Sequence, residues 1–138
     1  MKSSKNLLLG KLAVVDRNMV YLAGIEGDFR KGNQSYERLQ AVKYSLFEIV
    51  EACIDMASHI IAVEGFQKPD TYGELFVELA RNNVIGKELG ERLSKMAKVR
   101  NVLVHQYHRV DDDELREIIG RDLADVKKFV KSVYDYIG

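Results

Sequence analysis

Apolar residues recur at steps of three and four positions along most of this 138-residue chain. That spacing places apolar side chains on one face of an α-helix, whereas a half-buried strand would show alternation. The longest such stripe comprises Leu39, Val42, Leu46, Ile49, Cys53, Met56, Ile60 and Val63. The chain has a single proline, Pro69, and shows no two-residue turn of the kind that joins hairpin strands. The sequence therefore predicts an all-α protein.

Turn and capping residues divide the pattern into five predicted helices. Four are long, from about Lys5 to Glu26, Tyr36 to Val63, Lys87 to Val110 and Asp111 to Tyr136, and one is short, from Thr71 to about Asn82. Short connections between long amphipathic helices make neighbouring helices antiparallel. We therefore expect an up-and-down helical bundle of four main helices plus one short helix, forming a single domain over residues 1–138.

Three helix starts carry side chains that typically cap a helix. Residues 27–35 are rich in turn formers, and Ser35 or Asn33 is the expected cap of the second helix. Thr71 is followed three positions later by Glu74, and Asp111 likewise by Glu114. This spacing resembles a capping box, so we expect the third and fifth helices to begin there.

The composition is that of a globular protein, with 46% hydrophobic and 30% charged residues. Lys plus Arg and Asp plus Glu number 21 each, so a generally basic nucleic-acid coat is disfavoured, although a local basic cleft is not. The apolar run Leu7–Leu9 is too short for a signal peptide, and no run approaches the roughly 20 residues of a membrane span. We expect a cytoplasmic protein that does not enter membranes, with its lone cysteine, Cys53, buried as a small hydrophobic residue.

Glu51, Asp55 and His59 follow one another at steps of four and so share one face of the second helix. A di-iron bundle would need Glu-x-x-His pairs on two helices, and these are missing from the sequence. We expect this stripe to be a polar edge of the bundle. Asp55 is then a candidate positioning residue that supports Arg100 or His105.

A second conceivable metal site combines His105 and His108 with the acids that follow. Near a helix end, however, His108 and Arg109 would favour the negative end of the helix dipole, and Asp111 and Asp112 would cap the next helix. We therefore expect neither a metal nor another cofactor.

The fourth predicted helix turns a distinctive polar set away from the core. A helical wheel places Met96, Val99, Val102 and Leu103 on the core face and Arg100, Asn101, Val104, His105 and Tyr107 on the opposite side. Histidine exchanges protons near neutral pH, and arginine presents a planar fork that binds phosphate and stabilises developing negative charge. Asn101 lies one turn before His105, where it can orient the imidazole or hold a phosphate or ribose. A plainer interpretation is that Arg100 and His105 only favour the helix dipole.

The segment Arg100–Tyr107, with the sequence RNVLVHQY, resembles the motif of HepT-like proteins in the HEPN superfamily. That motif is an arginine, four further residues, a histidine, any residue and a tyrosine. Similar surroundings occur in family order at residues 51–60, at Lys68-Pro69 and Tyr72, and at residues 93–97. The likeness covers nearly the whole chain beyond the first predicted helix.

The resemblance implies a HEPN-like bundle and a metal-independent endoribonuclease toxin that cuts RNA with the ribose 2′-hydroxyl as nucleophile. It implies a homodimer in which Arg100 and His105 of both subunits line one cleft, with Val104 at the two-fold interface. It also implies a nucleotidyltransferase antitoxin of the MntA type, which silences the toxin by transferring AMP to Tyr107. On the wheel Tyr107 lies beside Arg100, so the added phosphate would block the RNA site. The alternative is a non-catalytic HEPN module that docks a nucleotidyltransferase.

Overall fold

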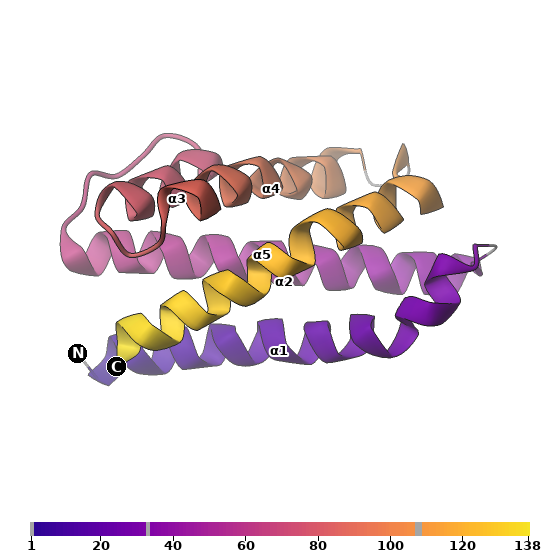
Figure 1. Ribbon diagram of the computed structural model, residues 1–138, viewed down its shortest axis with the longest axis horizontal. Coiled ribbons are helices and arrows are strands. Elements are labelled where there is room, and N and C mark those ends of the chain that lie inside the picture. Colours follow the sequence, from indigo (N-terminus) through magenta and orange to yellow (C-terminus); the bar gives the residue numbers. More distant parts are fainter. Residues whose placement is uncertain (1, 33, 107–108) are drawn as a thin grey trace.

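The computed structural model describes residues 2–32, 34–106 and 109–138, and within these ranges it contains helices and no strand. The helices are α1 (Lys2–Arg30), α2 (Tyr36–Glu64), α3 (Tyr72–Arg81), α4 (Lys87–His105) and α5 (Asp112–Ile137) (Figure 1). Four are long and α3 is short, as the sequence predicts. The all-α helical bundle is therefore confirmed.

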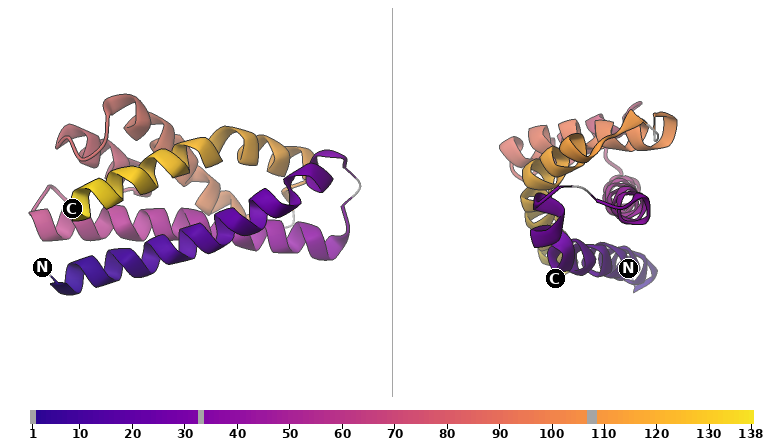
Figure 2. Two further views of the ribbon diagram at one scale, coloured as in Figure 1. Left: turned by 60° about the horizontal axis from the view of Figure 1, so that its bottom comes forward. Right: turned by 90° about the vertical axis from the view of Figure 1, so that its right-hand side faces the viewer.

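Helix α2 is the centre of the bundle, because it contacts each of the other four helices. Helices α1 and α2 run side by side in opposite directions, and α3 and α4 form a second hairpin on the other side of α2 (Figure 1). Helix α5 crosses obliquely and brings its end back to the start of α1 (Figure 2). The segment of α4 with the predicted site residues therefore belongs to a helix that packs against α2.

Side-chain caps begin three of the helices. Ser35, Thr71 and Asp111 each accept a hydrogen bond from the backbone N–H three residues later, at 3.1, 3.3 and 2.9 Å. These bonds confirm the predicted starts of α2, α3 and α5. Asn33, the other cap considered for α2, lies outside the described residues.

Two predicted helix ends are wrong. Helix α1 continues four residues past Glu26 to Arg30, and its last turn buries Phe29 to 2% exposure. Helix α4 ends at His105 instead of continuing to Val110. Val110 is 3% exposed, so the connection after α4 returns this side chain to the core before α5 begins.

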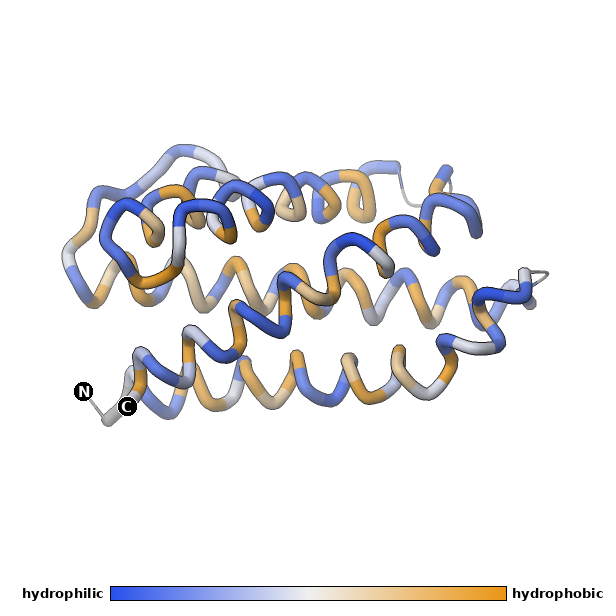
Figure 3. Tube along the Cα trace, viewed as in Figure 1, coloured by the Kyte–Doolittle hydropathy of each residue, from blue (hydrophilic) through white to orange (hydrophobic). Residues whose placement is uncertain are grey.

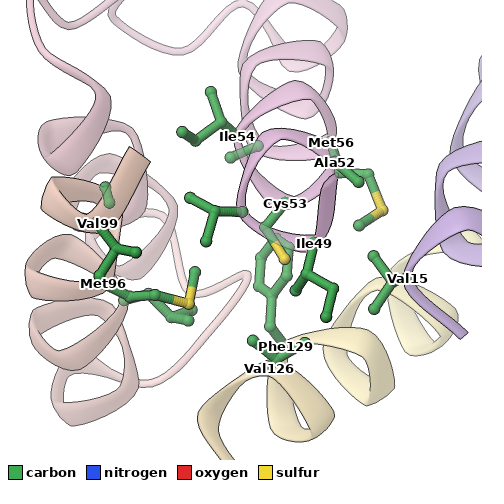
Figure 4. Packing of buried hydrophobic residues seen from close by; sticks show 14 of the residues in the cluster. Val15, Ile49, Ala52, Cys53, Ile54, Met56, Met96, Val99, Val126 and Phe129 are labelled. Atoms are coloured by element: carbon green, nitrogen blue, oxygen red, sulfur yellow. The ribbon is translucent and has the colours of Figure 1, made fainter. Parts of the chain in front are cut away.

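The core is built from one apolar face of each helix. Apolar and polar positions share every helix (Figure 3), and none of the described helices is long and apolar enough to cross a membrane. Cys53 and Ile49 of α2 point into the same cluster as Phe129 of α5 and Met96 of α4 (Figure 4). Burial raises the pKa of the Cys53 thiol to about 12, as befits a packing residue.

Two glycines allow α3 to approach α4 closely. A Cβ atom added to Gly90 would lie 2.8 Å from the Ala80 Cβ and 3.0 Å from the Phe76 carbonyl oxygen. One added to Gly73 would lie 2.8 Å from the Ser94 Oγ. At Gly90 a side chain would force the backbones apart, whereas at Gly73 the Ser94 hydroxyl would have to move. The close packing holds the first turn of α3 against α4, just before the predicted functional segment.

Candidate functional site

The outer face of α4 carries the polar set that the wheel assigns to it. Asn101, Val104 and His105 are exposed, and the Arg100 side chain is 21% exposed. On the opposite side the residues Met96, Val99 and Leu103 are buried, whereas Val102 is half-buried. The division of this helix between core and surface is therefore confirmed, with Val102 at its margin.

Arg100 is held by side chains from two other helices. Its Nε donates to Glu51 Oε1 of α2 at 3.1 Å, and its guanidinium carbon lies 4.9 Å from the centre of the Tyr72 ring of α3. Its Nη1 also reaches the Asn101 Oδ1 at 3.5 Å. The ion pair and the cation–π contact fix the direction of the guanidinium. The hydrogen bonds described for Arg100 use its Nε and Nη1 atoms. Its Nη2 therefore remains available to donate to an anion such as a phosphate.

Asp55 lies one turn beyond Glu51 and has a different partner. Its Oδ2 accepts from the Lys11 Nζ of α1 at 2.9 Å, and within the described chain no hydrogen bond joins it to Arg100 or His105. Glu51, which the sequence places in the same stripe, is the carboxylate that contacts Arg100. The i,i+4 spacing indicated a shared face, but it could not show which of the two carboxylates faces α4.

His105 is the last residue of α4 and is exposed. Five helical positions separate it from Arg100, which corresponds to about 140° around the axis and roughly 7.5 Å along it. Among the described contacts, none joins the two side chains. One copy of the chain therefore presents Arg100 and His105 on the same helix without bringing them together.

Tyr107, the expected AMP acceptor, lies outside the described residues. Its placement beside Arg100 assumed a helix that continues to Val110. Because α4 ends at His105, a helical wheel no longer determines where Tyr107 lies relative to Arg100.

A cleft of about 460 Å³ opens between the second half of α2 and the start of α3. Asp55 and Ser58 line it from α2, and Tyr72 lines it from α3. The Tyr72 ring is thus shared, because it borders the cleft and also contacts Arg100. No sequence pattern indicates this cleft, because it depends on the path of the connection between α2 and α3.

The three polar residues that share one face of α2, Glu51, Asp55 and His59, have different surroundings. Glu51 pairs with Arg100 and Asp55 with Lys11, while the Nε2 of His59 is buried and without a hydrogen-bond partner among the described residues. Within the described ranges, no group of three or more His, Cys, Asp or Glu side chains is arranged to hold a metal ion.

A family model described as "Ribonuclease HepT-like" matches residues 17–133, which include α4 and its outward face. The chain belongs to the HepT-like family. This HepT-like chain is 29% identical to the "mRNA nuclease HepT" of Shewanella oneidensis over 125 residues, which cover 91% of the chain and 94% of the relative. It is 27% identical to the "tRNA nuclease HepT" of Aphanizomenon flos-aquae over 103 residues, covering 75% and 70% of the two chains.

The fold has a close counterpart among solved structures. It superimposes on the tri-AMPylated HEPN toxin of Shewanella oneidensis, solved in complex with the MNT antitoxin, with a TM-score of 0.83 and 28% sequence identity. The match covers 94% of this chain and 97% of that toxin. The bundle described above is therefore the HEPN fold.

Proposed function

We propose that this HepT-like protein is a metal-independent endoribonuclease toxin that cuts RNA with Arg100 and His105. The observation that carries the proposal is the outward pair of an oriented arginine and an exposed histidine on α4, in a family of ribonucleases. The similarity to two relatives named as RNA nucleases supports it. The substrate class is RNA because its ribose carries the nucleophile.

In the proposed reaction the ribose 2′-oxygen attacks the adjacent phosphorus and the 5′-oxygen leaves. His105 accepts the proton of the 2′-hydroxyl or donates one to the departing 5′-oxygen. Arg100 binds the phosphate and stabilises the negative charge that develops on its oxygens. Asn101, 3.5 Å from the Arg100 guanidinium, holds a neighbouring phosphate or ribose, and Asp55 is assigned to RNA positioning. The reaction requires no metal because the nucleophile belongs to the substrate.

We assign the complete site to a homodimer. Arg100 and His105 diverge around α4, so a second copy is needed to bring an arginine and a histidine to the same phosphate. Val104 lies between them in sequence and is 43% exposed, which makes it a candidate for the two-fold contact. The arginine of one copy and the histidine of the other would then act on the same phosphate in the shared cleft.

Regulation is assigned to a nucleotidyltransferase antitoxin of the MntA type that transfers AMP to Tyr107. The support is the similarity to an AMPylated HEPN toxin in complex with an MNT antitoxin. We expect protein produced together with its antitoxin to gain mass in whole AMP units, located by peptide mapping at Tyr107. Intact-mass spectrometry of the Tyr107→Phe variant is the control. AMP retained by that variant at another residue would contradict the assignment.

Cleavage by purified, antitoxin-free protein tests the proposed activity. We expect Arg100→Ala and His105→Ala to lose cleavage, by about a hundredfold or more for the acid–base residue. Arg17→Ala removes an exposed cation on α1, away from α4, so this variant should cut RNA as the parent does. Equal cleavage by the parent, Arg100→Ala and His105→Ala would assign the activity to a contaminant and refute the proposal.

One observation favours the alternative of a non-catalytic module that docks a nucleotidyltransferase. Arg100 already has an ion-pair partner in Glu51 and a stacking partner in Tyr72, which is what a purely structural arginine would have. Stable co-purification with the nucleotidyltransferase, together with no cleavage by the AMP-free protein, would support this alternative.

A further inference from the structure

The cleft beside Arg100 has the composition of a small-molecule site. Its volume of about 460 Å³ lies within the range of ligand pockets in proteins. Its inner wall is aliphatic, with Ile54, Ile61 and Leu75 all buried in the bundle. Its rim is polar and includes the exposed Ser58 hydroxyl. An apolar slot with hydrogen-bonding groups at its edge matches a flat heterocycle better than it matches a phosphate.

Tyr72 connects this cleft to the proposed phosphate site. Its ring contacts the Arg100 guanidinium at 4.9 Å, and it is 41% exposed while lining the cleft. In an RNA strand the ribose and base lie directly next to the phosphate. A phosphate held by Arg100 therefore has a nucleoside within reach of Tyr72, and aromatic side chains are the usual platforms on which single-stranded bases stack.

We propose that the cleft between α2 and α3 is a subsite for one nucleobase next to the phosphate bound by Arg100, with Tyr72 as its stacking platform. The identification of the ligand as RNA rests on the proposed ribonuclease function. The base would thus lie between α2 and α3 and not on the outward face of α4. Residues outside the Arg-x(4)-His segment would then determine which base is bound.

Two carboxylates in the cleft indicate which bases fit. Asp55 and Asp70 line it together with Lys68; an ionised carboxylate only accepts hydrogen bonds, whereas the lysine ammonium only donates them. The exocyclic amino group of cytosine, adenine or guanine offers two N–H donors to the carboxylates, whereas uracil offers a single N3–H between two carbonyl oxygens that a carboxylate repels. Asp55 keeps its ion pair with Lys11 through Oδ2 and thereby stays oriented. With two carboxylates against one lysine, the subsite should favour a base that carries an exocyclic amino group.

Binding of mononucleotides to the antitoxin-free protein tests the subsite without requiring any cleavage. Cytidine 3′-monophosphate should shift the amide NMR signals of residues lining the cleft, and inorganic phosphate should not reproduce these shifts. Uridine 3′-monophosphate, of nearly the same size, should bind roughly tenfold more weakly, the order expected from one charge-assisted hydrogen bond. Equal binding of the two nucleotides, or the same shifts with phosphate alone, would overturn the proposal.

Variants separate the base platform from the support that Tyr72 gives to Arg100. Tyr72→Ala should weaken cytidine 3′-monophosphate binding by about 5- to 150-fold, the range reported for losing one stacked base, and Tyr72→Phe should retain it. Ala62→Phe fills the cleft from the exposed side of α2 without touching Arg100 and should also abolish binding. Tyr44→Ala removes an exposed tyrosine elsewhere on α2 and is the matched control. Unchanged binding in both Tyr72→Ala and Ala62→Phe would refute the subsite.

The outcomes distinguish this proposal from the ribonuclease proposal. If cleavage requires Arg100 and His105 but cytidine 3′-monophosphate does not bind in the cleft, the subsite alone is wrong. If the nucleotide binds there as described but the Arg100→Ala and His105→Ala variants cut as well as the parent, the ribonuclease proposal is wrong and the nucleotide site stands.

Discussion

At the scale of single residues, the guanidinium of Arg100 is the best-defined feature of the site. The sequence predicted that Arg100, Asn101 and His105 face away from the core, because that depends only on the helical repeat within α4. It did not predict Glu51 or Tyr72 as the partners of Arg100. Those contacts depend on how α2 and α3 are rotated and shifted against α4, which no local pattern records.

We assign Glu51 as the residue that positions the Arg100 guanidinium. We expect Glu51→Ala to lower kcat for RNA cleavage by about tenfold, because the guanidinium loses one of the two contacts that orient it. Unfolding free energy should change by less than about 1 kcal/mol, since both side chains of the pair are partly exposed to solvent. Steady-state kinetics and chemical denaturation measure the two effects.

The control for Glu51→Ala is Glu26→Ala, which removes a surface ion pair with Arg30 on α1. It should leave kcat unchanged. The Glu51→Gln variant keeps a hydrogen-bond acceptor, so we expect its kcat to lie between that of Glu51→Ala and that of the parent. A loss of stability in Glu51→Ala without any change in kcat would show that the ion pair is only structural.

At the scale of helices, local signals predicted most starts and fewer ends. The caps Thr71 and Asp111 act on N–H groups three residues away, so the sequence alone located them, whereas for α2 it left Ser35 and Asn33 as alternatives. The predicted end of α4 was wrong: the helix ends at His105, and Val110 is buried after the helix instead of within it. The error matters for function, since it removed the basis for placing Tyr107 next to Arg100.

The packing of α3 on α4 gives a test of the frame that positions Tyr72. Gly90→Ala should lower the unfolding free energy by about 1–3 kcal/mol, because the new methyl group overlaps Ala80 and the Phe76 carbonyl. Gly120→Ala in α5 meets no atom within 4 Å and should raise it by up to about 1 kcal/mol through helix propensity. Thermal or urea melts followed by circular dichroism compare the two. A Gly90→Ala protein as stable as Gly120→Ala would contradict the close approach.

At the scale of the whole molecule, the bundle presents the two residues proposed to react, Arg100 and His105, but no described contact joins their side chains. Helix α2 contacts every other helix and fixes Arg100 through Glu51, while His105 stands exposed at the far end of α4. The sequence predicted the bundle and its outward face from helical periodicity. A second copy was implied only by the family resemblance. A site that two symmetry-related copies form together leaves no pattern in the helical periodicity of one chain.

Complementation between the Arg100→Ala and His105→Ala variants tests whether two copies of the chain build one site. Arg100→Ala and His105→Ala are denatured together, refolded as a mixture and assayed for RNA cleavage beside each variant alone and the parent. If two copies build one site from Arg100 and His105, each variant alone is inactive, and the mixture regains a substantial part of the parent activity, because mixed dimers hold one intact arginine and one intact histidine in a shared cleft. Either single variant cutting RNA as the parent does, or a mixture of dimers as inactive as its components, would contradict the account.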